Sequence, residues 1–436
     1  MGSLDGSGGE AGWVSRLVLV HLDGHPGSQP RSFSLGPEPR TIRRAQTDST
    51  DIAIDHRSIS RQPHASVRFD PNGYAVVQDH GRGTGTYVNG ARLQGSAPVS
   101  PGALVRFGGV SCVVSAHPED PVLGNDPLSD HESPSLQRAR RLVERAAAGS
   151  MHVLLLGPTG AGKERLAERF HRSGGRPGPF VPVNCAGIPR DLLTAELFGH
   201  VAGAFSGASG AREGLWRRAH GGTLFLDEVA ELAPEHQSAV LRALDGSRVR
   251  PVGADDEVEV DVRVVAATSR DVDALEAEGQ LRSDLLGRLG GLRVRVPALK
   301  DRREEILPIF FAALGRSDLS LTAESAERLL LYPWPKNVRE LVNAARVVQL
   351  FADEVARIGV EILPESVRKH AEVGPPTSAT ERTAGSGPPP KLALESLLRD
   401  HRGNVEQVAR RLGVGRATVH RWLAKHSLSA ARFRAR

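Results

Sequence analysis

One stretch restricts the fold of this chain more than any other: an apolar run, then a glycine-rich loop, then an amphipathic segment. HVLLL (152–156) predicts a buried strand, GPTGAGKE (157–164) a tight loop, and RLAERFHR (165–172) a helix. In such a unit, backbone N–H groups and the helix N-terminus surround a phosphate, and Lys163 reaches the β- and γ-phosphates. The predicted phosphate-binding residues are Gly157, Pro158, Thr159, Gly160, Ala161, Gly162, Lys163 and Glu164.

Two acidic residues follow a second apolar strand. In GGTLFLDE (221–228) the run TLFL indicates a buried parallel strand, with Asp227 and Glu228 at its carboxyl end. There Asp227 is placed to hold a Mg²⁺ ion, and Glu228 to polarise an attacking water. The alternative interpretations are a helix cap for Asp227 and a solvated face for Glu228.

Hydroxyls and arginines further along extend this candidate site. VRVVAATS (262–269) predicts a third strand that brings the hydroxyl of Thr268 toward the γ-phosphate. LRSDLLGRL places Arg282 and Arg288 six residues apart, either as surface charge or as side chains that complete a neighbouring subunit's site.

A helix start near residue 337 brings another arginine toward the phosphates. WPKNVREL has Asn337 and Glu340 at capping-box spacing, which places Arg339 in the first turn of a helix. An arginine there is unfavourable beside the helix dipole, so a bound phosphate would account for it.

Turn signals and composition divide the chain into several units. Residues 13–116 contain short alternating strands, among them LVLVHL, HASVRF, YAVVQD and LVRFGGVSCVV, which predicts a β-sandwich. The remaining assignments are a linker (117–134), an α/β subdomain (135–296), a helical lid (297–370), a Pro/Gly-rich linker (371–390) and a helical module (391–428). The predicted fold class is multidomain: an all-β sandwich, an α/β P-loop domain with a helical lid, and an all-α module.

The C-terminal end is strongly basic. Residues 391–436 carry eleven Lys/Arg against three Asp/Glu, a net charge of +8, whereas the whole chain carries +5, which points to nucleic acid. GNVEQVARRLGVGRATVHRWLAKHSL reads as a helix-turn-helix with apolar residues at its core positions. The residues placed for groove contacts are Arg416, Thr418, His420, Arg421 and Lys425. A small helical dimerisation domain fits the same fold but not the charge.

Cysteine usage and the apolar runs bear on the compartment. Cys112 and Cys185 fall in different predicted domains, so we expect buried, reduced thiols rather than a disulfide. The longest apolar runs are too short to cross a bilayer, and the N-terminal segment does not resemble an export signal. We therefore expect a cytoplasmic protein that does not bind membranes.

Eight strings, in order and at the family's spacing, resemble the AAA+ domain of the sigma-54-dependent transcriptional activators, the bacterial enhancer-binding proteins. These are GPTGAGKE, FVPVNCAGI, ELFGH, GAFSGA, GGTLFLDE, LRSDLLGRL, RREEI and WPKNVREL. In that family a glutamate follows the phosphate-loop lysine. The resemblance implies that Asn184 tethers Glu228 and that Arg339 senses the nucleotide. It also implies that Arg282 and Arg288 act in trans within a ring, a hexamer, that uses ATP and Mg²⁺.

Within that resemblance, one loop matches the family's GAFTGA loop, which contacts sigma-54. Its residues are Gly203, Ala204, Phe205, Ser206, Gly207 and Ala208. The glycines allow the loop to change conformation with the nucleotide state, and Phe205 supplies an apolar contact at its tip. From the residues alone, an internal loop that tucks Phe205 into the core remains an alternative. Two departures from the family are Ser206 in place of threonine and Ser269 in place of asparagine.

The two ends of the chain carry further resemblances. Through TIRR, SISRQPHASV and GTGTYVNG the sandwich resembles a forkhead-associated domain, a phosphothreonine reader, and the C-terminal helices are similar to a Fis-type module. Arg44, Ser60 and Arg61 would surround the phosphate, because a dianion needs arginine forks and hydroxyl donors. His64 and Asn89 would support the loops. A protein-contact sandwich without phosphate preference is the alternative.

Together these resemblances predict a sigma-54-dependent activator bound to upstream enhancer DNA. It would read a phosphothreonine-containing partner and hydrolyse ATP in a ring to remodel the closed complex of sigma-54 RNA polymerase. A phosphopeptide-responsive DNA-binding scaffold with residual ATPase activity is the main alternative, favoured by Ser269 and the altered LRSDLLGRL segment. A third is an AAA+ remodeller that acts on another target.

Overall fold

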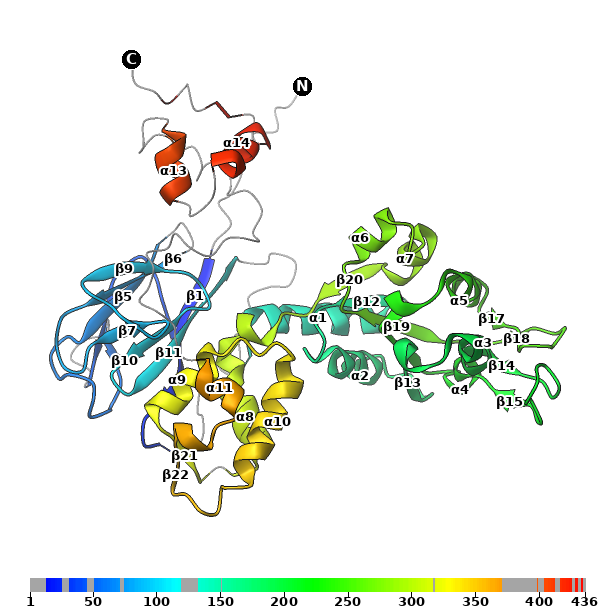
Figure 1. Ribbon diagram of the computed structural model, residues 1–436, viewed down its shortest axis with the longest axis horizontal. Helices are drawn as coiled ribbons and strands as arrows, with labels where there is room; N and C mark the ends of the chain where they lie inside the picture. Colours follow the sequence, from blue (N-terminus) through cyan, green and yellow to red (C-terminus); the bar gives the residue numbers. More distant parts are fainter. Residues whose placement is uncertain are drawn as a thin grey trace.

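The structure is a computed structural model. It describes residues 13–25, 31–44, 51–70, 74–118, 132–149, 151–316, 318–370, 398, 404–411, 416–425, 428, 429 and 433. Figure 1 shows a β-sandwich, a helical lid beside it and an α/β domain joined to the lid. The predicted fold class is confirmed: the described residues form a sandwich, an α/β domain with a helical lid, and two helices near the C-terminus. None of the described helices has the length and apolar composition needed to cross a bilayer.

Two sheets form the sandwich. Its strands are β1 (Trp13–Leu22), β2 (Arg31–Ser34), β3 (Arg40–Arg43), β4 (Asp51–Ala53), β5 (Ala65–Asp70), β6 (Tyr74–Asp79), β7 (Thr86–Val88), β8 (Ala91–Arg92), β9 (Ser96–Val99), β10 (Leu104–Phe107) and β11 (Val110–Pro118). Among the described residues one sheet has the order β2-β1-β11-β10-β7-β8 and the other β4-β3-β5-β6-β9. Alternate residues such as Leu17, Val67 and Phe107 fill the space between the sheets.

One predicted strand is in fact a hairpin. LVRFGGVSCVV was expected to run as a single strand, but Phe107 and Val110 pair with each other across a turn between β10 and β11. Gly108 has a φ of 59°, a left-handed conformation that glycine adopts without steric cost. The Gly-Gly pair therefore reverses the chain, and both halves pair as antiparallel neighbours.

The α/β domain has a parallel sheet of order β13-β16-β19-β12-β20 with helices on both faces. Its strands are β12 (Val153–Leu156), β13 (Phe180–Asn184), β16 (Thr223–Asp227), β19 (Arg263–Thr268) and β20 (Leu292–Arg295). The main helices are α1 (Pro134–Ala148), α2 (Lys163–Ser173), α3 (Arg190–Phe198), α5 (Pro234–Gly246), α6 (Val272–Ala277) and α7 (Ser283–Leu289). Leu154 and Leu155 pack into cores on opposite faces, which explains why the strand is apolar throughout.

Short elements connect these strands and helices. They are η1 (Cys185–Gly187), β14 (Gly199–His200), β15 (Arg212–Glu213), α4 (Leu215–Arg218), η2 (Val229–Glu231), β17 (Arg248–Val249) and β18 (Val258–Glu259). Cys112 and Cys185 are both buried free thiols, as predicted.

The lid is helical. It comprises η3 (Leu299–Asp301), η4 (Arg303–Glu305), α8 (Ile306–Leu314), β21 (Ser320–Leu321), α9 (Ala323–Leu331), α10 (Asn337–Gln349), β22 (Arg357–Ile358), η5 (Val360–Ile362) and α11 (Glu365–Lys369). Phe310, Leu329 and Trp334 lie in its core, where the indole Nε1 of Trp334 donates to the carbonyl of Leu329 at 2.9 Å.

The two C-terminal helices pack against each other. They are α13 (Val405–Arg411) and α14 (Arg416–Lys425), and Val408, Val419 and Leu423 form part of their shared core. Two other predicted core residues, Leu412 and Val414, lie outside the described residues.

The segment 302–305 joins the lid to the α/β domain. The guanidinium of Arg302 pairs with Glu305 at 2.9 Å and donates to the carbonyl of Ala161, in the phosphate loop, at 2.5 Å. The Glu305 carboxylate accepts a hydrogen bond from the backbone N–H of Ser133, the residue that caps α1. Arg302 and Glu305 are almost fully buried, so each depends on the other for its compensating charge.

The two residues between them reach the sandwich. Arg303 donates to the carbonyl of Gly102 at 2.6 Å, and the Glu304 carboxylate accepts from the hydroxyl of Ser115 on β11 at 3.4 Å. Burial raises the pKa of Glu304 from its ordinary 4.5 to about 7, although Arg16 and Ser115 oppose the shift.

The raised pKa of Glu304 predicts a pH-dependent stability. The folded chain holds the Glu304 proton more tightly than the unfolded chain does. The stabilisation is therefore fully present below about pH 4.5 and is lost as the pH rises through about 7, by roughly 3 kcal/mol at most. We expect Glu304→Gln to raise the unfolding midpoint at pH 8 and to leave it nearly unchanged at pH 5. Glu361→Gln, on the exposed lid surface, is the control, and equal shifts at both pH values would contradict the prediction.

Candidate nucleotide site

The phosphate loop lies between β12 and α2, as predicted. Gly160 and Gly162 have φ values of 75° and 103°, which side chains with a Cβ rarely adopt. At Gly160 a Cβ would also lie 2.3 Å from the carbonyl of Lys336 in the lid, so glycine is required there. Lys163 is buried, and its Nζ donates to the carbonyl of Gly157 at 2.8 Å. The loop is thus held around its own lysine.

The two acids lie at the end of β16, opposite the lysine. Glu228 Oε1 is 3.8 Å from Lys163 Nζ. Burial lowers the pKa of the lysine, and the two carboxylates partly offset this. Burial also raises the pKa of Asp227, which Lys163 counteracts. A carboxylate whose charged form is disfavoured by burial suits a divalent cation, so Asp227 fits the predicted Mg²⁺ role.

Ser269 holds the Glu228 carboxylate in this structure. Its backbone N–H donates to Oε2 at 3.0 Å, and its hydroxyl lies 3.1 Å from Oε1 and 3.0 Å from Oε2. Glu228 itself has a φ of 50°, an uncommon conformation for a side chain of this size. Asn184, which the resemblance implied as the tether, instead accepts a hydrogen bond from the backbone N–H of Ala186 at 3.0 Å.

Thr268 and Asn337 both form hydrogen bonds to the backbone of their own chain. Thr268 is fully buried, and its hydroxyl accepts from the backbone N–H of Arg270 at 3.1 Å. Asn337 was predicted to cap α10, but its side chain accepts from the backbone N–H of Leu299 at 2.8 Å and donates to the carbonyl of Thr159 at 3.0 Å. The cap prediction is wrong for Asn337, because its left-handed φ of 53° turns the side chain to the phosphate loop.

The other half of the predicted capping arrangement is present. Glu340 accepts from the backbone N–H of Lys336 at 3.0 Å, at the start of α10. Arg339 lies in the first turn, and its Cβ would be 3.2 Å from a Cβ on Gly160. The positive charge of Arg339 lowers the pKa of both Lys163 and Asp227, although burial and the nearer charges have larger effects. Arg339 is therefore part of the electrostatics of the phosphate site.

Arg282 and Arg288 lie on the surface, at either end of α7. Arg282 pairs with Asp284 at 2.7 Å and Arg288 with Asp245 at 2.5 Å, and all four side chains are about half exposed. The structure does not bring these arginines to the nucleotide site of their own chain.

The loop 203–208 lies between β14 and β15, at the end of the α/β domain (Figure 1). Gly203 donates from its backbone N–H to the carbonyl of Ala208 at 2.8 Å, which closes the loop at its base. Phe205 is 37% exposed and packs edge-on against His200, with ring centroids 5.0 Å apart. Phe205 therefore does not lie in the core, and Ser206 beside it is exposed.

In the sandwich, three predicted phosphate ligands lie on neighbouring loops. The backbone N–H of Arg44 donates to the carbonyl of Ser60 at 2.9 Å, and its guanidinium is 3.5 Å from the exposed carboxylate of Asp55. Arg61 is exposed. His64 joins two loops, since Nδ1 accepts from the Ser60 N–H at 3.4 Å while Nε2 contacts the Gly85 carbonyl at 3.3 Å. Asn89 accepts from the backbone N–H of Leu104 at 3.0 Å.

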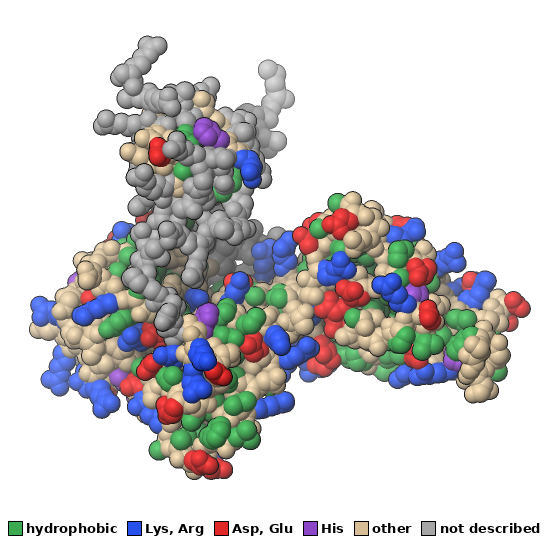
Figure 2. Space-filling model, in the orientation of Figure 1, with side chains coloured by type: hydrophobic (Ala, Val, Ile, Leu, Met, Phe, Trp, Pro, Cys, Tyr) green, Lys and Arg blue, Asp and Glu red, His purple; other side chains and the backbone are tan. Residues whose placement is uncertain are grey.

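Figure 2 shows several Lys or Arg side chains along the free edge of the sandwich. Arg57, Arg61 and Arg82 are exposed on the same group of loops. A surface of this kind attracts a phosphate dianion.

On α14, His420 and Arg421 are exposed. Arg416, Thr418 and Lys425 belong to the same helix, but their side chains lie outside the described part of the structure.

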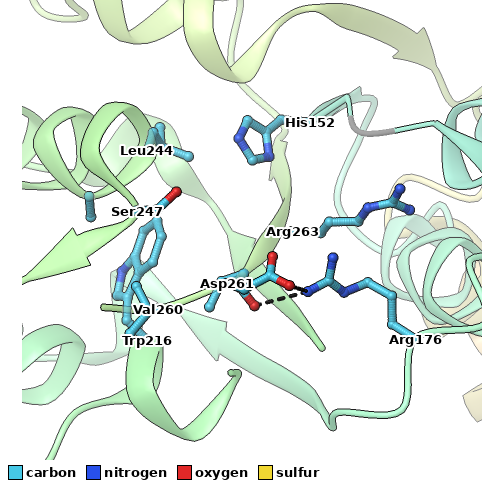
Figure 3. Close-up of a pocket in the computed structure, with 10 residues that line it drawn as sticks. His152, Arg176, Trp216, Leu244, Ser247, Val260, Asp261 and Arg263 are labelled. Atoms are coloured by element: carbon cyan, nitrogen blue, oxygen red, sulfur yellow. Dashed lines mark hydrogen bonds and ion pairs between the residues drawn. The ribbon is translucent and has the colours of Figure 1, made fainter. Parts of the chain in front are cut away.

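Figure 3 shows a cavity of about 230 Å³ lined by residues at the amino ends of β12 and β19. The phosphate loop follows the carboxyl end of β12, so it lies at the opposite end of the strands. The cavity is lined by His152, Arg176, Trp216, Ala243, Leu244, Ser247, Val260, Asp261, Val262 and Arg263. Arg176 pairs with Asp261 at 2.6 Å, and His152 accepts from the backbone N–H of Val264 at 3.1 Å. Arg176, Asp261 and His152 therefore already have partners, whereas the indole Nε1 of Trp216 has no hydrogen-bond partner among the described residues. The cavity is separate from the nucleotide site.

Sequence reasoning missed two contacts. Ser269 was noted only as a departure from the family, and its grip on Glu228 follows from how two strand ends meet in space. Arg302 lies in the quoted string RREEI, but no spacing rule shows that it reaches the carbonyl of Ala161.

Comparison with known proteins agrees with this arrangement. Residues 130–295 match the family described as the Sigma-54 interaction domain, 41–108 the FHA domain, 301–380 the AAA+ ATPase lid domain, and 392–426 the bacterial regulatory protein, Fis family. The DNA-binding transcriptional regulator NtrC of Klebsiella pneumoniae is 35% identical over 335 residues, which cover 69% of this chain and 70% of that protein.

Two other relatives are similarly close. The nitric oxide reductase transcription regulator NorR1 of Cupriavidus necator is 37% identical over 334 residues, 69% of this chain and 65% of that protein. The structure of NtrX from Brucella abortus in complex with ATP aligns with a TM-score of 0.51 and 29% identity, covering 68% of this chain and 69% of that one. The chain thus spans about two thirds of the length of these relatives.

The parallel sheet, the phosphate loop with its buried lysine, the two acids and the helical lid define an AAA+ P-loop ATPase. The chain belongs to the family of sigma-54-dependent transcription activators, and it carries an FHA domain toward one end and a Fis-type domain toward the other.

The contact between Ser269 and Glu228 generates a prediction. Ser269→Ala removes the hydroxyl donor but keeps the backbone one, so we expect kcat for ATP hydrolysis to fall about tenfold. The KM for ATP should change by less than about twofold, because Lys163 and the loop are untouched. Ser269→Thr keeps the hydroxyl and should restore turnover. If Thr and Ala behave alike in a steady-state assay, the hydroxyl does not position Glu228.

Proposed function

We propose that the chain hydrolyses Mg²⁺·ATP in a ring, and that this drives loop 203–208 against sigma-54 to remodel the polymerase closed complex. The observation that carries the proposal is an exposed Phe205 on a closed, glycine-flanked loop, in a domain whose phosphate loop holds a buried Lys163 opposite Glu228. A partly exposed aromatic at a loop tip is suited to bind another protein.

The chemistry follows from the residues around Lys163. Lys163 and the loop amides would bind the phosphates, and Asp227 would hold the magnesium ion, which neutralises charge on the phosphates when bound. Glu228 would orient a water for attack on the γ-phosphate, and Ser269 fixes the direction of its carboxylate. Arg339, carried by the lid, would report the nucleotide state to the lid helices.

A ring of subunits would explain why Arg282 and Arg288 lie on the surface, away from the nucleotide site of their own chain. Arg282 and Arg288 pair with exposed carboxylates, and such surface pairs contribute little energy. A phosphate of a neighbouring subunit would compete well for them, since guanidinium–phosphate contacts are strong where water is excluded. We therefore propose a homo-oligomer, most simply a hexamer, in which these arginines act in trans.

The end domains would recruit partners in the cytoplasm. The exposed His420 and Arg421, with Arg416, Thr418 and Lys425 on the same helix, would contact enhancer DNA. Arg44, Ser60 and Arg61 would bind phosphothreonine in a partner protein.

Purified transcription tests the mechanism. We expect Lys163→Ala to abolish ATP turnover and open-complex formation at a sigma-54 promoter. Phe205→Ala should retain ATP turnover within about twofold. Open-complex formation should fall at least about tenfold, because burying the phenyl ring against the partner contributes about 2 kcal/mol of binding free energy. Ser206→Thr is the conservative control. Open complexes formed by Lys163→Ala with ATP would instead favour the DNA-binding scaffold.

Phosphothreonine reading is tested separately. The probe is a phosphothreonine peptide selected by binding of the full chain to a degenerate library, with its unphosphorylated form as reference. We expect Arg44→Ala to weaken binding of the phosphorylated peptide about tenfold or more in fluorescence anisotropy. Arg68→Ala, on β5, should bind as the wild type does. A library that yields no phosphorylation-dependent binder would refute this part of the proposal.

A further inference from the structure

The sandwich has an apolar face outside its own core. Along β1, Leu17 and Leu19 point between the sheets, whereas Val18 and Val20 point outward. A solitary sandwich exposes such outward positions to water and fills them with polar residues. Here Val18 and Val20 are fully buried against the lid core, which explains why LVLVHL is apolar on both faces.

Two more outward residues join the same contact. Leu104 and Val113 belong to the lid's hydrophobic cluster rather than to the core between the sheets. Figure 1 shows β1, β10 and β11 beside α9 of the lid. The apolar surface and its cover therefore belong to one chain.

Ion pairs border this apolar contact. Arg106 on β10 is 3.1 Å from Glu327 on α9, and both side chains are less than one-fifth exposed. Asp23, just after β1, pairs with Arg357 and accepts from the backbone N–H of Ala323 at 3.1 Å. Asp23 thus holds both the start of α9 and the β22 segment of the lid.

Asp23 is also hydrogen-bonded to the loops of the sandwich that carry the proposed phosphothreonine ligands. Its carbonyl is 2.9 Å from His56 Nε2, and His56 Nδ1 is 2.7 Å from the hydroxyl of Ser58. Ser58 lies two residues before the proposed ligand Ser60. On the other side, His56 follows Asp55, which is the ion-pair partner of Arg44.

The Gly108–Gly109 turn locks these groups together. The N–H of Gly109 donates to the Ser58 hydroxyl at 2.8 Å, and its carbonyl accepts from the N–H of Asp23 at 2.9 Å. A Cβ on Gly109 would lie 2.8 Å from the Cβ of Asp23 and 2.9 Å from the His56 ring. The junction has no room for a side chain at Gly109, so we expect a shift of the loops to be passed on to Asp23.

We infer that this contact couples phosphothreonine binding to nucleotide binding. A phosphate dianion would draw Arg44 from Asp55 and pull on the Ser58–His56–Asp23 chain, which changes how Asp23 holds Arg357 and α9. The lid in turn contacts the phosphate loop through Asn337 and Arg302. The inference rests on the proposed phosphothreonine and ATP sites, and it adds that the sandwich acts on the lid of its own chain.

The test is a pair of affinity measurements on the full chain. The peptide affinity is measured with and without a non-hydrolysable ATP analogue, and the analogue affinity with and without the selected phosphothreonine peptide. Coupling requires the two ratios to be equal, and we expect about fivefold or more. Asp23→Ala and Arg357→Gln should each reduce the ratio below about twofold, while both ligands still bind. Arg68→Ala is the control on the other sheet.

Each outcome points to one cause. A ratio of one in the wild-type chain, with both ligands bound, overturns the coupling but leaves the two sites standing. If no phosphorylated peptide binds, the phosphothreonine proposal fails. The structural link between the sandwich loops and the lid is then tested without a ligand. In that case hydrogen exchange is compared between the wild type, Ser58→Ala and the control.

Ser58→Ala removes the acceptor of the Gly109 N–H and the partner of His56. We expect amides at the start of α9 and in β22 to exchange about threefold to tenfold faster in this variant, because a link in the chain to Asp23 is lost. Arg68→Ala should leave these amides unchanged. Unchanged exchange in Ser58→Ala would overturn the inference.

Discussion

The structure depends on one buried ion pair, Arg302 with Glu305. Buried charges are costly unless each finds a partner and further hydrogen bonds, and here the carbonyl of Ala161 and the N–H of Ser133 supply them. The pair fixes the phosphate loop, the start of α1 and the lid relative to one another. The residues between them, Arg303 and Glu304, extend the same segment to the sandwich. Four consecutive residues of the lid segment therefore contact both the α/β domain and the sandwich.

Burial also determines which charged groups of the nucleotide site are stable without a ligand. Burial drives both Lys163 and Asp227 toward their neutral forms. The carboxylates of Glu228 and Asp227 favour the charged form of Lys163, and Lys163 favours the charged form of Asp227, which Glu228 disfavours. Bound nucleotide and magnesium would supply the missing charges, so the site is better satisfied when loaded. Ser269 adds directed donors to the one acid that must face a water.

Much of this could be predicted from local sequence. Strand–loop–helix spacing identified Lys163, an apolar run ending in two acids identified Asp227 and Glu228, and glycines around Phe205 indicated a loop with an apolar tip. These features are local: a strand, a turn and the helix that follows are consecutive in the chain. The same reasoning was wrong where one pattern allows two structures, as at the Gly108–Gly109 turn and at Asn337.

The sequence by itself determined the elements, their order and the chemistry each one carries. Only the tertiary structure decided which elements meet. Ser269 holds Glu228 because two parallel strands end side by side, and Asp23 holds Arg357 because the sandwich rests on the lid. Val18 and Val20 are apolar and point outward, which indicates a covered face. The lid that covers them begins only at Leu299, and no local sequence period encodes that contact. Contacts between distant segments depend on packing, which no short window of sequence contains.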